Sequence, residues 1–458
     1  MAATRTRGRP PKLLVELFVI AAVMAAAAIS VYFGFRAPPI HDELPLGGRN
    51  VDVSNSSAAQ FEASVAVDPT EPKRLLAASM DDLADARAYA STDGGVTWTS
   101  QPAPPSQRGA CGLSHPDVAI GGRGLELYAS LVTDTCQPPD PLLFVATRHG
   151  ISATWRVRRV GSSGRYVFDQ RPSVAVDAAR RAYIVWPRLV GEFSSRQVVL
   201  FSRSPDGGAT WSKPVQIGRY SGVYGVDLAA ARNGDLYLAV SDGLHRRIDL
   251  LRSTTGGSTW TPARRVARLA VPYVVGCGAG AAQVRAQPQR CISAVAHLAL
   301  TPRTVAIVYG DADRDGTYAV YVSTFDRALR TFGGTRDVRR AGKGRADQFL
   351  PTVAYDATIG DLWLCYYDTR GDSTRKHAWY TCTVSRDDGR TWARPVHAAS
   401  AKSDETETGS DALGYGDVEG LAAADGVAHP VWTDNRNSLS LAEEIYTAAI
   451  PASRLGRR

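Results

Sequence analysis

The sequence lacks most of the short motifs that assign an enzyme class directly. Its eight histidines form no HExxH pair, its six cysteines form no CxxC pair, and neither a phosphate-binding loop nor a GxSxG nucleophile elbow occurs. After residue 36, no stretch has the 3.6-residue hydrophobic period of an amphipathic helix. These absences argue against the zinc-protease, phosphate-loop and serine-hydrolase classes, and they predict a chain built of strands.

A concentrated excess of charge is also absent. The chain has 458 residues and a net charge of +8, with 44% hydrophobic residues that allow a large core. Residues 1–36 hold five basic residues and one acidic residue, so 5 − 1 = +4 of that charge lies there and +4 is spread over the remainder. Nucleic-acid binding needs a concentrated basic face. No nucleic-acid partner is therefore expected.

An apolar run near the N-terminus predicts a membrane anchor. Leu13–Phe35 is interrupted only by Glu16 and Ser30, and about 20 apolar residues span a bilayer as a helix. Basic residues precede this run, which predicts a cytoplasmic N-terminus and an extracytoplasmic body, periplasmic or at the cell surface. A signal peptide cleaved near Ala26–Ala28 is the alternative. The expected parts are a tail (1–12), an anchor (13–35), a stalk (36–49), a main domain (50–451) and a basic tail (452–458).

The main domain is a repeat. A short phrase recurs, consisting of a polar residue, an aliphatic alternation and often Asp. Its copies begin at Ser64, Asp117, Ser173, Asp227, His297, Thr352 and Glu419, at intervals of 53, 56, 54, 70, 55 and 67 residues. A second period-2 run follows each copy, and a third follows most of them, so each unit predicts three or four short strands.

Units of this kind are typical of propeller blades. We expect an all-β, monomeric propeller of four-stranded antiparallel sheets with seven blades, six being the alternative. The last unit lacks an outer strand, and Asn50–Ser54 precedes the first phrase. We predict that this N-terminal segment completes the last blade and closes the ring.

A sharper signature marks the predicted turns between third and fourth strands. Asp would cap backbone N–H groups, Gly would supply positive φ, and Trp would pack between sheets. The three full copies are Ser91, Asp93, Gly95, Trp98; Ser204, Asp206, Gly208, Trp211; and Ser385, Asp387, Gly389, Trp392. A fourth copy, Ser253 to Trp260, has Thr255 in place of Asp.

These turns resemble the BNR or Asp-box repeats of bacterial sialidases and related propellers. The resemblance covers roughly residues 50–450, and the segment from Gly416 to Arg436 also looks like the final blade of that family. In that family the boxes are structural and lie on the face opposite the active site. The resemblance therefore implies no catalytic role for the box aspartates.

The six cysteines suit an oxidising compartment. They occur as neighbours in the chain: Cys111 and Cys136, Cys277 and Cys291, Cys365 and Cys382. Cys365 and Cys382 are equidistant from a predicted hairpin turn, so they can face each other across the ladder and form a disulfide. For the other cysteines, disulfides, metal ligation and free thiols remain open.

Asp and Arg recur where the second strands end. A ring of such residues on the face opposite the boxes would suit an anionic or hydroxyl-rich ligand. The candidate ligand-binding residues are Arg188, Asp313, Arg314, Asp368, Arg370, Asp417, Asp434 and Arg436. The alternative is that these Asp–Arg pairs brace adjacent blades and satisfy loop amides.

The sialidase resemblance implies three arginines that hold the substrate carboxylate and a Tyr nucleophile activated by a Glu. The residues of this chain that would be catalytic remain unassigned. The family's Phe/Tyr-Arg-Ile-Pro motif is replaced by Phe61-Glu62-Ala63-Ser64, so its arginine is missing. Tyr366, Tyr367, Tyr415 and Glu419 are candidates for the Tyr–Glu pair.

No cofactor is expected apart from calcium. Asp311, Asp313 and Asp315 followed by Gly316 match the opening of a calcium loop, but Val322 stands where an EF-hand has Glu. A shortened calcium loop and a plain acidic turn are the two alternatives. The function expected overall is recognition of a glycan, a cell-envelope polymer or a protein partner. A divergent sialidase or other glycosidase, and a scaffold for a membrane complex, are the alternatives.

Overall fold

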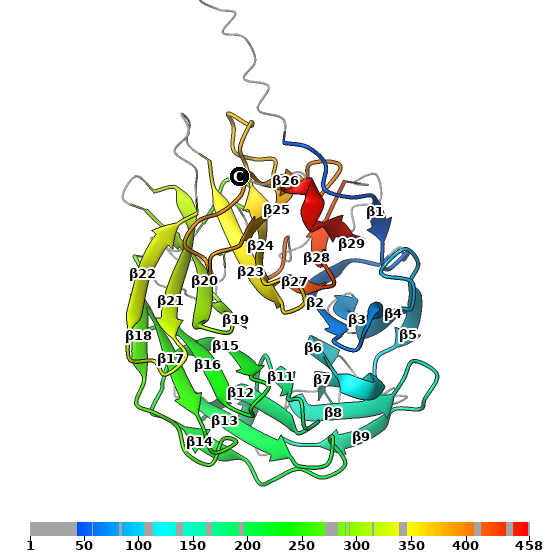
Figure 1. Cartoon of the computed structure of the whole chain (residues 1–458), viewed down its shortest axis with the longest axis vertical. Helices are drawn as coiled ribbons and strands as arrows, with labels where there is room; N and C mark the ends of the chain where they lie inside the picture. The colour runs from blue at the N-terminus through cyan, green and yellow to red at the C-terminus, as the bar shows by residue number, and fades with distance from the viewer. Residues whose placement is uncertain are drawn as a thin grey trace, which may run out of the picture. The chain divides into compact units, whose positions relative to one another are not determined.

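The computed structural model describes residues 44–456 apart from several gaps. The gaps are 57, 82–84, 105–112, 134–140, 162–166, 192–196, 271–282, 289, 293, 314–315, 339–345, 407–413 and 437–442. The chain divides into two compact units, Met1–Glu43 and Leu44–Arg458, and all described residues belong to the second. That unit is a closed ring of seven antiparallel sheets (Figure 1). The prediction of an all-β, seven-bladed propeller is confirmed.

Each blade is built from consecutive strands. Blade 1 is β2 (Gln60–Asp68), β3 (Glu71–Asp81), β4 (Asp85–Ser91) and β5 (Thr99–Pro102). Blade 2 is β6 (Leu113–Gly121), β7 (Leu125–Thr133), β8 (Pro141–His149) and β9 (Arg156–Arg159). Blade 3 is β10 (Val167–Asp169), β11 (Ser173–Val176), β12 (Ala182–Val190), β13 (Gln197–Ser204) and β14 (Val215–Ile217). Blade 4 is β15 (Val223–Ala230), β16 (Leu236–Asp242), β17 (Arg247–Ser253) and β18 (Arg264–Arg268).

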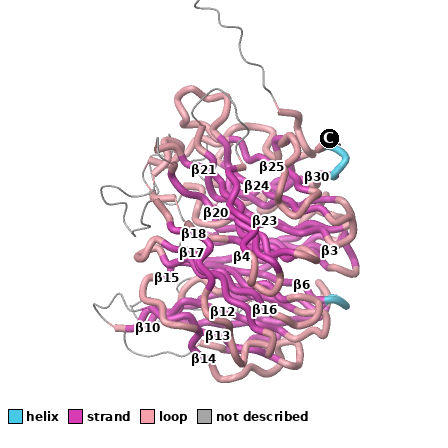
Figure 2. Tube along the Cα trace, turned by 60° about the vertical axis from the view of Figure 1, so that its left-hand side comes forward, coloured by secondary structure: helices cyan, strands magenta, loops and turns pink. Residues whose placement is uncertain are grey.

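The remaining blades follow the same order. Blade 5 is β19 (His297–Leu300), β20 (Thr304–Ala312), β21 (Tyr318–Asp326) and β22 (Phe332–Asp337). Blade 6 is β23 (Gln348–Asp356), β24 (Asp361–Asp368), β25 (Trp379–Ser385) and β26 (Val396–His397). Blade 7 is β27 (Gly420–Ala424), β28 (Val427–Asp434), β29 (Glu444–Ala448) and β1 (Asn50–Asp52), with β30 (Ile450–Pro451) beside β28. In the described ranges the helical elements are two 3-10 turns, Gly122–Gly124 and Ala452–Arg454, and strand dominates the view in Figure 2.

The recurring phrase forms or directly precedes the innermost strand of each blade, and neighbouring innermost strands pack around the whole ring. The ring closes as predicted, because β1 pairs with β29 in the register Asn50↔Ala448. The segment before β1 also runs beside blade 6, where Gly47 N donates to the carbonyl of His397 at 2.8 Å. The N-terminal strand therefore ties two blades together.

The core lies between the blades. Each of seven apolar clusters joins two neighbouring sheets, for example Leu127 and Val145 of blade 2 with Ile184 and Trp186 of blade 3. A blade therefore has no core of its own, and burial of apolar surface favours the complete ring.

Four turns between third and fourth strands share one hydrogen-bond pattern, and we call them the Ser–Trp corners. In blade 1, Ser91 Oγ accepts from Gly95 N at 2.9 Å, and Asp93 Oδ1 accepts from Thr97 N at 3.0 Å. The corners at 204–211 and 385–392 repeat these bonds. At 253–260, Thr255 Oγ1 accepts from Thr259 N at 2.9 Å, so a hydroxyl replaces the carboxylate. Trp98 and its counterparts pack against the cluster shared with the preceding blade.

Cys365 and Cys382 form a disulfide directly across β24 and β25, with Cα atoms 4.1 Å apart. Cys291 is also disulfide-bonded, while Cys111, Cys136 and Cys277 lie outside the described residues. The predicted anchor, residues 13–35, lies outside them too. Among the residues that the structure describes, no helix is long and apolar enough to cross a membrane.

Candidate functional site

The site begins with a distortion of the innermost strands where they enter the ring. Because strands alternate, these entrances lie on the face opposite the Ser–Trp corners, which we call the loop face. The ladder shifts register between Phe61 and Ser64, and again between Ser114 and Asp117. Glu62 and His115 lie inside these bulges with φ of 56° and 51°. Bulges re-aim side chains and strained φ values gather at functional sites, so this level of the ring is a candidate site.

Side chains of different blades meet in one polar group, the axial cluster. Its members come from blades 1, 2, 3, 4 and 7 and from the segment before blade 5: Glu62, His115, Arg171, Tyr224, Arg290 and Asp417. Both arginines contact both carboxylates, with Arg171 Nη2 at 3.0 Å and Arg290 Nη2 at 3.7 Å from Glu62 Oε1.

The cluster is completed by a histidine and a tyrosine. His115 Nδ1 lies 2.5 Å from Glu62 Oε2, and the Tyr224 hydroxyl donates to Asp417 Oδ2 at 2.7 Å. The Arg171 guanidinium also lies over the Tyr224 ring, 4.9 Å from its centroid. Residues up to 246 positions apart therefore meet only because the ring closes.

Burial and the neighbouring opposite charges act in opposite directions on the pKa values of the cluster. Burial alone would raise the pKa of Glu62, but Arg171 and His115 hold it well below its usual range. Burial would lower the pKa of Arg290, whereas Asp417 and Glu62 raise it. Two guanidinium groups thus face two buried carboxyl groups in alternating contact. Glu62 and Asp417 are almost completely buried, while the side chains of Arg171 and Arg290 remain 12% and 19% exposed.

A cavity of about 220 Å³ lies along the axis at this level and is lined by the start of every innermost strand. Glu62, His115 and Arg171 contribute to its wall. The remaining polar lining comes from the first position of each phrase: Ser64, Asp117, Ser173, Asp227, His297, Thr352 and Glu419.

Two of these carboxyl groups join three blades each. Asp117 accepts from Ser64 Oγ of blade 1 at 2.7 Å and from Val174 N of blade 3 at 2.8 Å. Asp227 accepts from Leu298 N of blade 5 at 2.7 Å and lies 3.4 Å from Ser173 Oγ of blade 3.

Burial in the cavity wall changes the pKa of its carboxyl groups and of a histidine. Burial raises the pKa of Asp117 to about 7 and that of Asp227 to about 6, against the opposing effect of their hydrogen bonds. Burial also lowers the pKa of His297 to about 4, so this imidazole is neutral at pH 7 and can both donate and accept. The cavity wall therefore offers both hydrogen-bond donors and acceptors.

The Asp–Arg candidates from the sequence lie elsewhere, in pairs within single blades. Arg188 Nε and Nη2 donate to Asp169 at 2.5 and 2.8 Å. Arg370 Nη2 lies 3.5 Å from Asp368, whose pKa is raised by burial despite that arginine. These two pairs therefore do not connect adjacent blades.

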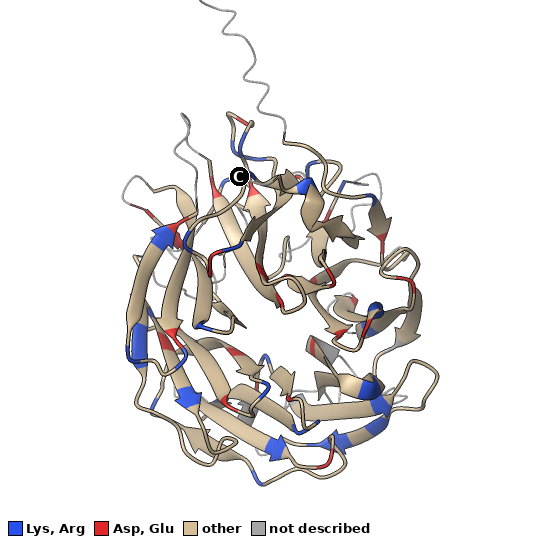
Figure 3. Cartoon of the chain, viewed as in Figure 1, with Lys and Arg blue, Asp and Glu red and all other residues tan. Residues whose placement is uncertain are grey.

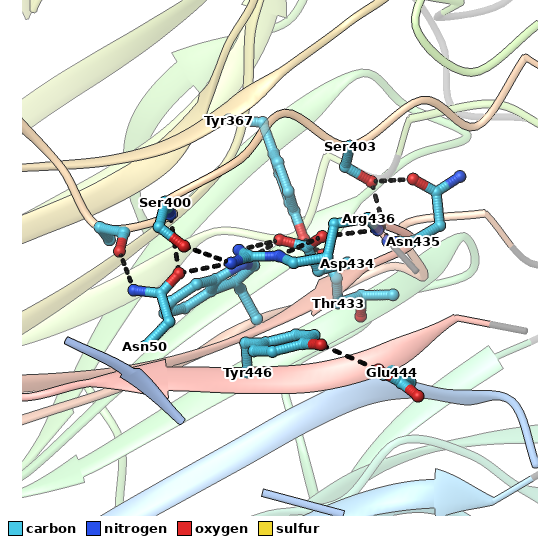
Figure 4. Close-up of polar contacts among 12 residues, drawn as sticks. Asn50, Tyr367, Ser400, Ser403, Thr433, Asp434, Asn435, Arg436, Glu444 and Tyr446 are labelled. Atoms are coloured by element: carbon cyan, nitrogen blue, oxygen red, sulfur yellow. Dashed lines mark hydrogen bonds and ion pairs between the residues drawn. The ribbon is translucent and has the colours of Figure 1, made fainter. Parts of the chain in front are cut away.

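Figure 4 shows the third pair, which belongs to ring closure. Arg436 donates to Asp434 from Nε at 3.0 Å and from Nη2 at 2.5 Å, while its Nη1 reaches Asn50 Oδ1 of β1 at 2.6 Å. Its guanidinium lies over the Tyr446 ring, 4.2 Å from the centroid. Of the predicted ligand-binding set, Asp417 belongs to the axial cluster, and Arg314 lies outside the described residues.

The remaining sequence candidates have local roles. Tyr367 donates to Glu419 Oε1 at 2.6 Å, but its side chain is fully buried and its pKa is raised well above the usual value by burial and by Glu419. In the predicted calcium loop, Asp311 accepts from Ala270 N at 2.8 Å, and the Asp313 N–H donates to the Thr317 carbonyl. Asp315 lies outside the described residues.

Sequence reasoning missed most of the axial cluster: Glu62, His115, Arg171, Tyr224 and Arg290. A signal was present, because the position two residues before each phrase is Glu62, His115, Arg171 and Asp417 in four of the seven copies. Arg290 carried no such signal, because it comes from the insertion that ends at Cys291.

No family model matches the chain, and no curated protein matches it. Solved structures with a similar architecture include Hadza microbial sialidase Hz136, at 16% identity over 84% of this chain and 74% of that one, with a TM-score of 0.46. An α-L-arabinanase of Penicillium chrysogenum is 11% identical over 89% and 99%, with a TM-score of 0.48. Trypanosoma rangeli sialidase is 12% identical over 90% and 60%, with a TM-score of 0.42.

Proposed function

We propose that this propeller is a membrane-anchored, extracytoplasmic protein of the Asp-box type that binds one hydroxyl-rich sugar unit of a glycan in its axial cavity. The observation that carries this proposal is the charge-compensated polar wall of the cavity. Sugar hydroxyls both donate and accept, and they suit a wall of paired arginines, a neutral imidazole and carboxyl groups whose pKa is raised by burial. The cavity of about 220 Å³ is smaller than a drug-sized site, which favours a single sugar unit.

The ion pairing within the axial cluster argues against a free anion as the ligand. Glu62 and Asp417 already occupy the two arginines, so a carboxylate ligand would have to compete with buried, hydrogen-bonded partners. The hydrophobic segment 13–35 and the disulfides support an extracytoplasmic location, and the Ser–Trp corners support the Asp-box assignment.

Binding is tested with the full-length protein in detergent, first on a glycan array and then by titration calorimetry with the best neutral ligand. His115→Ala and His297→Ala each remove one polar group from the cavity wall, and we expect each to weaken binding roughly tenfold. His245→Ala is the matched control, because His245 pairs with Asp242 outside the cavity. Unchanged affinity in both cavity variants, or no glycan binding at all, would contradict the proposal.

A divergent glycoside hydrolase is our second candidate, supported by one contact. Tyr224 donates to Asp417 beside two arginines, which places a hydroxyl, a carboxylate and guanidinium groups together on the loop face. Turnover of a fluorogenic sialoside that is lost in Tyr224→Phe would support an enzyme. Glycan binding without turnover would leave the binding function alone.

A further inference from the structure

A second cavity lies on the opposite face of the ring, between blades 3 and 4. It has a volume of about 500 Å³ and runs between the corner at 204–211 and the corner at 253–260. Blades 3 and 4 are the one pair of consecutive blades in which both described third-to-fourth turns carry this pattern. We call this cavity the corner groove.

The composition of the corner groove is unlike that of the axial cavity. Its wall includes Arg181, Arg203, Trp211 and Asn233 together with serine and threonine hydroxyls, and none of its lining residues in the described chain is acidic. In Figure 3, basic residues recur along the outer strands in the lower half of the ring, where blades 2 to 4 lie. The groove therefore combines cations, an aromatic ring and neutral hydrogen-bonding groups.

The absence of acid from this wall depends on Thr255. The other three corners have Asp at this position, and its carboxylate accepts the N–H four residues later. Thr255 keeps that bond with its hydroxyl at 2.9 Å and removes the negative charge. The substitution preserves the turn and changes only what the groove presents to a ligand.

Arg203 is the positively charged residue next to Thr255, and the neutral side chain at 255 provides no carboxylate to pair with it. Its Nη1 donates to the carbonyl oxygens of Thr255 at 3.3 Å and of Gly256 at 3.0 Å. Carbonyl partners orient the guanidinium but do not neutralise it. Arg181, by contrast, is paired with the buried Asp177 at 2.6 Å. One exposed guanidinium, fixed across two blades, thus faces a wall without acid.

We propose that the corner groove is a separate binding site for an anionic saccharide, that is, a sugar carrying a carboxylate or sulfate group. Arg203 would pair with the anion, since guanidinium groups bind carboxylate and sulfate oxygens with two parallel N–H donors. Trp211 would cover an apolar sugar face, and Asn233 and the hydroxyls would bind sugar hydroxyls. A volume of about 500 Å³ is in the range of sites for small ligands, roughly 300–1,000 Å³, and admits more than one sugar unit.

The test is titration calorimetry of the full-length protein with tetragalacturonate and with a sulfated tetrasaccharide, using cellotetraose and hexaglutamate as comparison probes. Thr255→Asp places a carboxylate where the other corners have one, so we expect folding to be retained while the groove wall gains a negative charge. We expect binding of one or both anionic tetrasaccharides to fall at least tenfold in Thr255→Asp and in Arg203→Ala. Thr255→Ser, which stays neutral, is expected to bind like the wild type.

Arg158→Ala is the control for loss of an exposed arginine. Arg158 makes the same kind of contact, donating to the Ala209 carbonyl at 3.1 Å, but it lies outside the groove lining. Equal binding by wild type and Thr255→Asp, equally tight binding of cellotetraose or hexaglutamate, or no binding of either anionic saccharide would overturn the proposal. Circular dichroism and thermal unfolding confirm that each variant is folded.

Discussion

The axial cavity and the Ser–Trp corners lie on opposite faces of the ring and differ in how their aspartates are satisfied. Asp117 and Asp227 depend on groups from other blades, and burial raises the pKa of both. Asp93 and Asp206 are satisfied within a turn of a few residues. The Thr210 hydroxyl and N–H, acting on an exposed carboxylate, lower the pKa of Asp206 to about 2. The comparison shows that the axial carboxylates require the assembled ring, whereas the corner carboxylates require only their own loop.

The largest expected effect comes from breaking the axial cluster. Asp417→Asn removes one of the two carboxylates that pair with Arg171 and Arg290, and an incompletely paired buried charge is costly. We expect the free energy of unfolding to fall by about 3 kcal/mol or more. Denaturant unfolding followed by tryptophan fluorescence measures this loss.

Asp388→Asn is the matched control for that experiment. Asp388 pairs with Arg303 at 2.6 Å, but the arginine side chain is 76% exposed. Exposed ion pairs contribute roughly 0–1 kcal/mol, so this variant should unfold close to the wild type. Equal losses in the two variants would remove the distinction between the axial cluster and an ordinary surface pair.

A smaller effect is expected at the corners. Asp206→Ala deletes the acceptor for the N–H and hydroxyl of Thr210, and loss of such a cap costs about 1 kcal/mol. Asp206→Thr should cost less, because Thr255 already fills the equivalent place in blade 4. The same unfolding measurement applies, and a Thr variant as unstable as the Ala variant would show that the corner needs the carboxylate itself.

The sequence predicted the parts that rest on local pattern. Period-2 runs fixed the seven innermost strands, and the missing outer strand of the last unit pointed to Asn50–Asp52 as its replacement. Cys365 and Cys382 could be paired because a hairpin turn centres them. The axial cluster could not be assembled in this way, since Arg171 and Asp417 meet only after ring closure, and Glu62 is projected by a bulge that shifts the register of its strand. Strand periodicity carries no information on where such a bulge projects its side chain.

The pH dependence of the two aspartate classes gives the most specific difference. A carboxyl group whose folded pKa is raised contributes stability that is complete below its ordinary value of 3.8 and is lost as pH rises through the folded pKa, about 7 for Asp117. The destabilisation caused by Asp117→Asn should therefore be largest near pH 5 and shrink toward pH 8.

Asp206 has a lowered pKa, about 2, so its contribution is complete above 3.8 and is lost only as pH falls further. The cost of Asp206→Asn should be constant from pH 5 to 8. Each variant is unfolded beside the wild type at the same four pH values. The contribution of the buried histidines to the free energy of unfolding then cancels, because it is the same in every protein compared. If the cost of the two substitutions changes with pH in the same way, Asp117 does not hold its proton more tightly in the folded ring, and the contrast between axial and corner aspartates rests on geometry alone.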